Sequence, residues 1–250
     1  MALREGQYAP EFMLKSHLEQ VVSLSDYRGK MNVVIAFFPL AWTPIWTAQI
    51  PSYQVALDRF DGFNTQVLGI SVDSHHCLRA WAESLGGITY PLLSDFYPHG
   101  KTAQSYGVLR AEGFSERAIF VIDKTGRIRY VDVHQIDLQP VNEELFGVLA
   151  DIEPFGKPVI QIEPIASSEP KADVVMYCTP WCPGCSRARA FLQERGIPFV
   201  EINIARDRAA AARVREWTGG NETTPTFNIK GKIIIDYNKF QLAAALGINP

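Results

Sequence analysis

The segment Cys182-Pro183-Gly184-Cys185 constrains the fold more than any other feature, because it stands between an apolar run and a helical pattern. The run Val174-Val175-Met176-Tyr177 predicts a buried strand, and residues 186–192 predict a helix. The amides and partial positive charge of a helix N-terminus favour a thiolate at the first cysteine. The second cysteine is then placed to attack a mixed disulfide formed on the first. The segment therefore predicts thiol–disulfide chemistry.

Length and composition indicate a globular protein with one large domain or two smaller ones. The chain has 250 residues, 47% hydrophobic and 20% charged, and its net charge of −3 carries no nucleic-acid signature. Three of its four cysteines lie within residues 178–185, which indicates redox or metal chemistry in a reducing compartment. Neither an apolar leader nor a run of about 20 apolar residues is visible. We therefore expect a cytoplasmic location and no membrane partner.

A proline-punctuated stretch divides the chain. Pro154, Pro158, Pro164 and Pro170 interrupt a segment of linker composition. We predict an N-terminal domain over 1–157, a linker over 158–171 and a smaller domain over 172–250. Both domains alternate strands with helices, which predicts an α/β class with a mixed sheet in the first domain.

The expected elements follow from periodicity. In the first domain they are strands at 33–38, 67–72 and 118–122, the last forming a hairpin with 127–131, and helices near 46–60, 75–85, 101–106 and 141–152. In the second they are strands at 173–177, 198–203, 226–229 and 232–236, and helices that start near 182, 206 and 239.

The second domain resembles glutaredoxins and related redoxins over nearly all of residues 172–250. The motifs are Trp181-Cys182-Pro183-Gly184-Cys185 and, about 40 residues on, Thr224-Pro225-Thr226. The resemblance implies a thioredoxin fold with Cys182 as nucleophile and Cys185 as resolving thiol. It also implies a cis bond at Pro225 and a substrate-binding backbone at Thr224. Residues 230–237 lack the Gly-Gly pair of glutathione-binding glutaredoxins, so the reductant could be thioredoxin reductase or another low-molecular-weight thiol.

Two metal-site interpretations are weaker. Cys178, Cys182 and Cys185 form C-x₃-C-x₂-C, a spacing that iron–sulfur enzymes use, but Cys178 ends a strand and is interpreted as a small buried apolar residue. His75 and His76 adjoin Cys77, yet neighbours on a helix point about 100° apart, so we expect no shared metal ion. We assign no cofactor.

The first domain resembles peroxiredoxins, most closely the one-cysteine alkyl hydroperoxide reductase E group. The main motif is the segment from Phe37 to Gln49, which matches P-x₃-T-x₂-C at Pro39 and Thr43, and supporting motifs lie at 8–12, 69–73, 91–95, 106–108 and 117–123. The resemblance implies a second thioredoxin-fold domain. Arg117 would acidify the peroxidatic thiolate and polarise the peroxide, Thr43 would hydrogen-bond it, and Pro39 would shield the thiolate from water.

The register of that motif puts the peroxidatic cysteine at position 46, where the chain has Trp46. Indole offers one N–H and no thiolate, so we expect the peroxidase step to be inactive. Trp46 could be an engineered substitution, a natural loss that leaves a binding domain, or a sign that Cys77 has taken over. The first is favoured, because Pro39, Thr43 and Arg117 have little reason to occur together without a thiolate. An indole in a cysteine pocket would overfill it, and we expect the first helical turn to unwind.

Three functional hypotheses follow. The first is a peroxiredoxin–glutaredoxin fusion that reduces hydroperoxides with the redoxin half as built-in reductant, present in a form without the peroxidatic cysteine. The second is a thiol–disulfide oxidoreductase whose N-terminal half only binds a client or dimerises. The third is an iron–sulfur or zinc carrier. Aromatic residues lie near the motif, at Phe38, Trp42 and Trp46, and the resemblance implies dimerisation through edges close to that loop. We therefore expect a homodimer.

Overall fold

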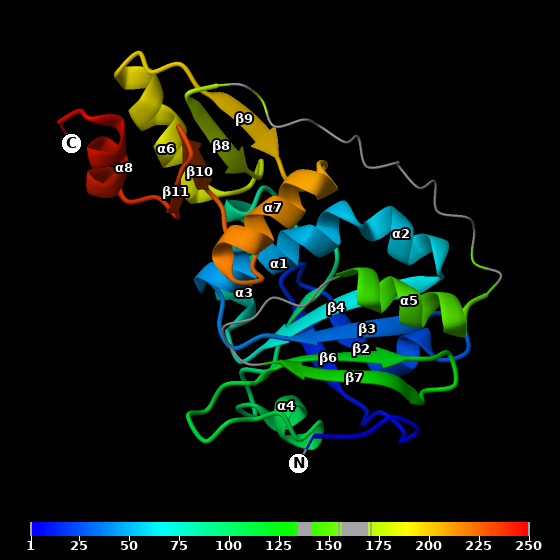
Figure 1. The fold of residues 1–250 in the computed structure, drawn as a ribbon. Coiled ribbons are helices and arrows are strands. Elements are labelled where there is room, and N and C mark those ends of the chain that lie inside the picture. The colour runs from blue at the N-terminus through cyan, green and yellow to red at the C-terminus, as the bar shows by residue number, and fades with distance from the viewer. Residues whose placement is uncertain (1, 135–141, 155, 157–169, 171, 250) are drawn as a thin grey trace. The chain divides into compact units, whose positions relative to one another are not determined.

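The computed structural model describes residues 2–134, 142–154, 156, 170 and 172–249, with only the backbone for residues 44–48, 134 and 208. The chain divides into two compact units, Met1–Ile160 and Gln161–Pro250 (Figure 1). The division falls within the predicted linker 158–171, which lies outside the described residues apart from residue 170. None of the described helices is long and apolar enough to cross a lipid bilayer.

The first unit is built on a seven-stranded mixed sheet in the order β2-β1-β5-β4-β3-β6-β7. Strands β3, β4 and β5 are parallel, β6 runs antiparallel to β3, and β6 and β7 form the predicted hairpin. The bounds are β1 Met13–Ser16, β2 Val21–Ser23, β3 Asn32–Phe37, β4 Thr65–Ser71, β5 Leu92–Ser94, β6 Arg117–Ile122 and β7 Ile128–His134. The sequence missed β1, β2 and β5, because three or four residues are too few to show a period.

Helices cover both faces of this sheet (Figure 1). They are the 3-10 helix Leu24–Tyr27, α1 Pro44–Val55, α2 Leu57–Gly62, α3 His75–Ser84, α4 Lys101–Ser105 and α5 Asn142–Ile152. One core contains Ile50, Trp81 and Phe146 from α1, α3 and α5. The other contains side chains of β1 and of the residues around α4.

The structure corrects two expectations for residues 46–60. The predicted single helix is two helices, since α1 ends at Val55 and Ala56 leaves helical geometry with φ −97° and ψ 8° before α2 begins. The unwinding expected around Trp46 is wrong, because α1 begins at Pro44 and its backbone is helical through position 46. A proline at the first helical position has its φ already set for the helix.

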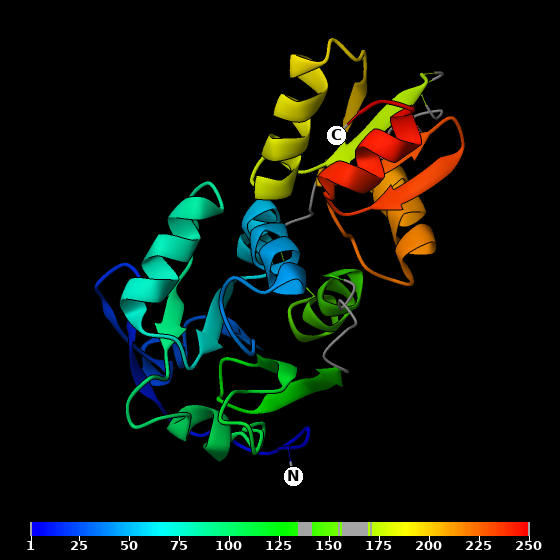
Figure 2. The same ribbon diagram turned by 90° about the vertical axis from the view of Figure 1, so that its left-hand side faces the viewer.

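The second unit has a four-stranded sheet in the order β11-β10-β8-β9. Its strands are β8 Val174–Cys178, β9 Val200–Asn203, β10 Thr226–Ile229 and β11 Lys232–Ile235, and its helices are α6 Pro183–Glu194, α7 Arg208–Thr218 and α8 Lys239–Leu246. Helices α6 and α8 pack on one face of the sheet, and α7 packs on the other (Figure 2). The parallel pair β8–β9 and the hairpin β10–β11 follow the predicted order of elements.

Candidate active sites

The dithiol lies at the junction of β8 and α6. Strand β8 ends at Cys178, and after a short turn Cys182 becomes the N-cap residue of α6, with Pro183 at the first helical position. The Cys182 Sγ accepts a hydrogen bond from the backbone N–H of Cys185 at 3.0 Å. A cysteine therefore does here what Ser, Thr, Asp or Asn does at most helix starts, and its sulfur meets the unpaired amides of the first turn.

These contacts separate the acidities of the two thiols. The pKa of Cys182 is lowered to about 7, first by a hydrogen bond from the Cys185 side chain and then by others that include the amides of Cys185 and Gly184, against the opposing effect of burial. The pKa of Cys185 is raised far above its ordinary value, mainly by burial and next by its hydrogen bond to Cys182. The pair thus holds one thiolate near neutral pH, on Cys182, and keeps the proton on Cys185.

The loop before β10 closes over this pair. The Thr224–Pro225 peptide bond is cis, as the sequence predicts. The Cys182 thiol lies 3.3 Å from the carbonyl oxygen of Thr224, to which it donates when protonated. A Cβ at Gly184 would lie only 2.9 Å from Cδ of Pro225, so glycine is what allows this loop to approach the helix. Cys182 is 5% exposed and Cys185 is fully buried.

The sequence analysis missed a charged pair that links α6, the helix that carries the dithiol, to β9. Arg189 of α6 makes a bidentate ion pair with Glu201 of β9, at 2.7 and 2.8 Å. The Cys178 thiol donates to Glu201 Oε2 at 3.4 Å. Burial, followed by the Glu201 charge, raises the pKa of Cys178 to about 12. Cys178 is buried as predicted, but it is a hydrogen-bonded thiol rather than a simple apolar filler; only the β8–β9 register could have revealed its partner.

The three cysteines of the second unit do not converge as metal ligands. Within the described part of the chain, the only three ligand atoms of His, Cys, Asp and Glu that lie within 4.8 Å of one another belong to Glu19, His75 and His76. The Cys178 sulfur is directed to Glu201 instead. This geometry does not support the carrier hypothesis.

In the first unit, the predicted peroxidatic segment forms the loop between β3 and α1. Pro39 is buried and Thr43 is the N-cap residue of α1, with its hydroxyl donating to the Leu40 carbonyl at 2.9 Å. Asp73 holds this loop, because its carboxylate accepts a hydrogen bond from the Ala41 N–H at 2.8 Å. Trp42, at φ +66°, is 56% exposed. Phe38, expected to add to this aromatic surface, is fully buried against Trp81.

Arg117 reaches the same edge of the sheet from another strand. It is the first residue of β6, next to Ala118, which pairs with Phe37 at the end of β3. Arg117 is 2% exposed, and its charge acts on the buried Tyr53 of α1. The Tyr53 hydroxyl accepts from Gln49 Nε2 at 2.7 Å. Pro39, Thr43 and Arg117 thus come from the elements that meet at one end of β3, around the start of α1.

Cys77 is the one thiol near this loop, and it is not activated. Its Sγ donates to Asp73 Oδ1 at 3.7 Å. Burial, and next the Asp73 charge, raises the pKa of Cys77, while a hydrogen bond with Trp42 opposes the rise only in part. The contacts therefore favour a protonated thiol, which is a poor replacement for a peroxidatic thiolate.

Comparison with known proteins agrees with both halves of this description. The sequence model of the AhpC/TSA family matches residues 6–131, and the glutaredoxin model matches residues 174–234. Alkyl hydroperoxide reductase E of Mycobacterium tuberculosis is 40% identical over 134 residues, which cover 53% of this chain and 87% of that protein. The spinach chloroplast protein 2-Cys peroxiredoxin BAS1 is 32% identical, with 61% of each chain covered.

Solved structures give the same fold. The reduced 2-Cys peroxiredoxin of Plasmodium vivax superposes with a TM-score of 0.56 at 29% identity, over 60% of this chain and 82% of that one. The two units are therefore a peroxiredoxin-type thioredoxin-fold domain and a glutaredoxin-like domain with its own small sheet, as predicted. The chain belongs to the AhpC/TSA family of peroxiredoxins.

Proposed function

We propose that this chain has the architecture of a peroxiredoxin–glutaredoxin fusion for thiol-dependent hydroperoxide reduction, and that its own chemistry is thiol–disulfide exchange at Cys182 and Cys185. The observation that carries the proposal is the Cys182 sulfur, an N-cap group that accepts the Cys185 amide at 3.0 Å and has a pKa of about 7. At neutral pH about half of such a thiol is thiolate, the reactive form.

The exchange proceeds in two substitutions at sulfur. The Cys182 thiolate attacks one sulfur of a client disulfide, an S–S bond forms, and the other client sulfur leaves as thiolate and takes up a proton. Cys185 then loses its proton and attacks Cys182 Sγ, which releases the second client thiol and leaves the Cys182–Cys185 disulfide. The client gains two electrons and the dithiol loses two. Thr224 and Pro225 would bind the client as an extended segment beside Cys182.

In a chain with cysteine at position 46, the same dithiol would serve the peroxide half. Hydroperoxide would oxidise that thiolate to a sulfenic acid and leave as alcohol, with Pro39, Thr43 and Arg117 supporting the step. Cys182 would attack the sulfenic sulfur with loss of water, and Cys185 would resolve the mixed disulfide. With Trp46 the first step has no nucleophile, so we infer that hydroperoxide is not reduced by this route in the present sequence.

A second candidate function is favoured by the lack of an activated thiol in the first unit. Its only cysteine is Cys77, whose pKa is raised. On this alternative the first unit is a non-catalytic binding or dimerisation domain attached to a thiol–disulfide oxidoreductase. The large exposed side chains of Trp42, Phe96 and Tyr97 provide apolar surface for a homodimer.

We propose a low-molecular-weight thiol or a thioredoxin reductase-type enzyme as the reductant of the dithiol, and a cytoplasmic location for the protein.

The variant Trp46→Cys distinguishes the two candidates. If the fusion proposal is correct, this variant consumes hydroperoxide in the presence of a thiol reductant, and the further change Cys182→Ser slows turnover without preventing a single oxidation of the thiol introduced at position 46. The matched control Thr47→Cys places a thiol one residue later in the same helix and should be inert. No turnover by Trp46→Cys, in protein whose dithiol still reduces a model disulfide, would support the binding-domain alternative.

A further inference from the structure

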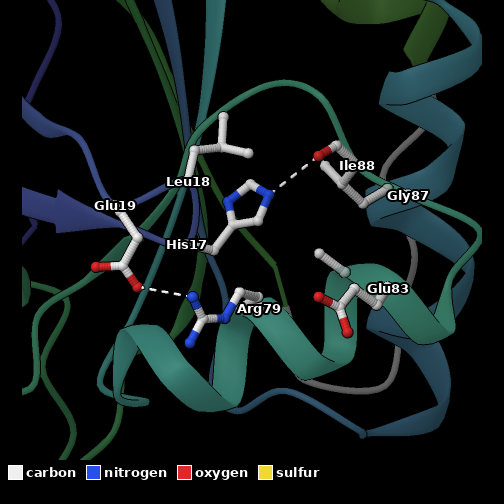
Figure 3. Close-up of a pocket in the computed structure, with 8 residues that line it drawn as sticks. His17, Leu18, Glu19, Arg79, Glu83, Gly87 and Ile88 are labelled. Carbon is white, nitrogen blue, oxygen red and sulfur yellow. Dashed lines mark hydrogen bonds and ion pairs between the residues drawn. The ribbon is translucent and has the colours of Figure 1, made fainter.

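Three side chains with metal-binding atoms converge on the surface of the first unit. They are Glu19, from the turn between β1 and β2, and His75 and His76, the first two residues of α3. One ligand atom from each lies within 4.8 Å of the other two. Glu19 also lines a cavity of about 310 Å³, together with Arg79 and Glu83 of α3 (Figure 3).

Local structure brings these groups together. Glu19 has a left-handed backbone, with φ +64°, in a turn held by the Ser16 hydroxyl, which accepts from the amides of Leu18 and Gln20. The His75 and His76 rings turn toward each other, with centroids 3.9 Å apart. The Cα–Cβ bonds of these helical neighbours diverge, but the imidazole side chains at the open first turn are long enough to converge again.

A cation from the protein already bridges two of the three groups, Glu19 and His76. Arg79 Nη1 lies 2.9 Å from Glu19 Oε1, and Arg79 Nη2 lies 3.1 Å from His76 Nδ1. A guanidinium has donors only, so the imidazole nitrogen must be the acceptor, with its lone pair directed at the positive charge. His75 Nε2 is 3.8 Å from the same Glu19 oxygen. Lys15 neutralises the other carboxylate oxygen at 2.5 Å.

We propose that Glu19, His75 and His76 form a surface site for a divalent transition-metal ion of the Zn²⁺ class, and that Arg79 is the internal cation the metal displaces. Two imidazoles and one carboxylate are a zinc donor set, with water in the fourth position. Imidazole ligands select such ions over Mg²⁺ and Ca²⁺. The site is independent of the dithiol and of the proposed function.

The required movement is small. In a tetrahedral site with bonds of about 2.0 Å, ligand atoms lie about 3.3 Å apart. Atoms now within 4.8 Å must therefore close by about 1.5 Å at most, which rotation of side chains at the surface can supply. Arg79, once displaced, has a new partner in Glu83, one turn further along α3 and on the wall of the same cavity (Figure 3).

The test is calorimetric titration of Zn²⁺ into the full chain, in a Cys182→Ser/Cys185→Ser background that removes the dithiol as a competing ligand. We expect His75→Ala and His76→Ala each to weaken binding at least tenfold, and the control His99→Ala to leave it unchanged. The informative variant is Arg79→Gln. Removing the competing charge should strengthen binding, roughly tenfold for a divalent ion about 5 Å away in a water-like dielectric.

Co²⁺ gives a second measurement, because a nitrogen and oxygen site shows a tetrahedral visible spectrum without a thiolate-to-metal charge-transfer band. Binding that is insensitive to His75→Ala and His76→Ala would overturn the proposal, as would an Arg79→Gln variant that binds no better than its parent. Circular dichroism of the metal-free variants checks their fold. If an alanine variant is unfolded, the Arg79→Gln titration and the cobalt spectrum of the parent decide alone.

Discussion

Replacing Cys185 by alanine should raise the pKa of Cys182 and so reduce its reactivity at neutral pH. The hydrogen bond from the Cys185 side chain is the largest cause that lowers the pKa of Cys182 to about 7. Alanine removes that donor and keeps the backbone N–H that also reaches the sulfur at 3.0 Å. The expected direction is therefore upward, toward the value of about 9 for an unperturbed thiol.

The upper limit of the effect can be worked out. At pH 7 a thiol with pKa 7 is about one-half thiolate, and a thiol with pKa 9 is about one-hundredth thiolate, a loss of about fiftyfold. A more basic thiolate is more nucleophilic, with a Brønsted slope of about 0.45, which returns about eightfold. Cys182 of the variant should thus be alkylated about sixfold more slowly than Cys182 of the wild type at pH 7. Near pH 10, where Cys182 is ionised in both proteins, the variant should react about eightfold faster. This reversal with pH distinguishes a change in acidity from a change in access.

The assay is alkylation by iodoacetamide from pH 5 to 10, with the peptide that contains Cys182 quantified by mass spectrometry. Cys185→Ser is the matched control, because its hydroxyl can still donate, and it should titrate between the wild type and Cys185→Ala. An unchanged midpoint in Cys185→Ala would refute the reasoning. It would mean that the amides of the helix start, rather than the second thiol, set the acidity of Cys182.

Three further changes should have measurable effects. The pKa of Cys182 is lower in the folded chain than in the unfolded chain, so its thiolate stabilises the reduced fold at high pH, and this contribution disappears as pH falls through about 7. Between pH 6 and 8.5 the free energy of unfolding, measured by urea denaturation, should therefore grow by about 2 kcal/mol. Gly184→Ala brings a Cβ to 2.9 Å from the Pro225 ring and should cost about 1–3 kcal/mol of stability. Glu201→Gln should lower the pKa of Cys178. The lowering should be partial, because burial is the largest cause of the raised value, and it should appear as faster alkylation of Cys178 at pH 9.

Each change has a control. Reduced Cys182→Ser should lack the pH-dependent gain, and an equal gain in that variant would assign it to other groups. Gly147→Ala, in α5 with no atom within 4 Å of the new Cβ, should be tolerated or stabilising, in contrast to Gly184→Ala. For Glu201→Gln, a Cys178 that stays inert at pH 9 would show that burial alone protects this thiol.

The sequence predicted the elements that have strong patterns. The apolar runs of β3, β4, β6 and β8 are long enough to identify buried strands, and the position of Cys182 at a helix start followed from the strand before it and the helical pattern after it. Short strands such as β1 and β2 carry no such signal, because their place depends on pairing, of β2 with β1 and of β1 with β5, and not on their own residues.

The contacts that tune the thiols were beyond sequence reasoning for the same reason. Glu201 acts on Cys178 only through the register of β8 with β9. Asp73 fixes the loop at Ala41 because two segments some 30 residues apart meet at one edge of the sheet. The rings of His75 and His76 converge through side-chain rotation that helical geometry does not specify.

Proximity to a helix start does not by itself activate a thiol in this protein, and the two units provide the comparison. At α3, the N-cap residue Ser74 accepts the amide of Cys77 at 3.2 Å; at α6, the N-cap residue Cys182 accepts the amide of Cys185 at 3.0 Å. The spacing is identical, but only in α6 is the acceptor itself the sulfur. Cys77 gives its amide to serine, keeps a carboxylate as neighbour and has a raised pKa, whereas Cys182 has a lowered one. The cap position of α6 therefore contributes to activation, because it brings the Cys182 sulfur to the first-turn amides and to the Cys185 thiol, whereas the Cys77 sulfur meets Asp73 and Trp42.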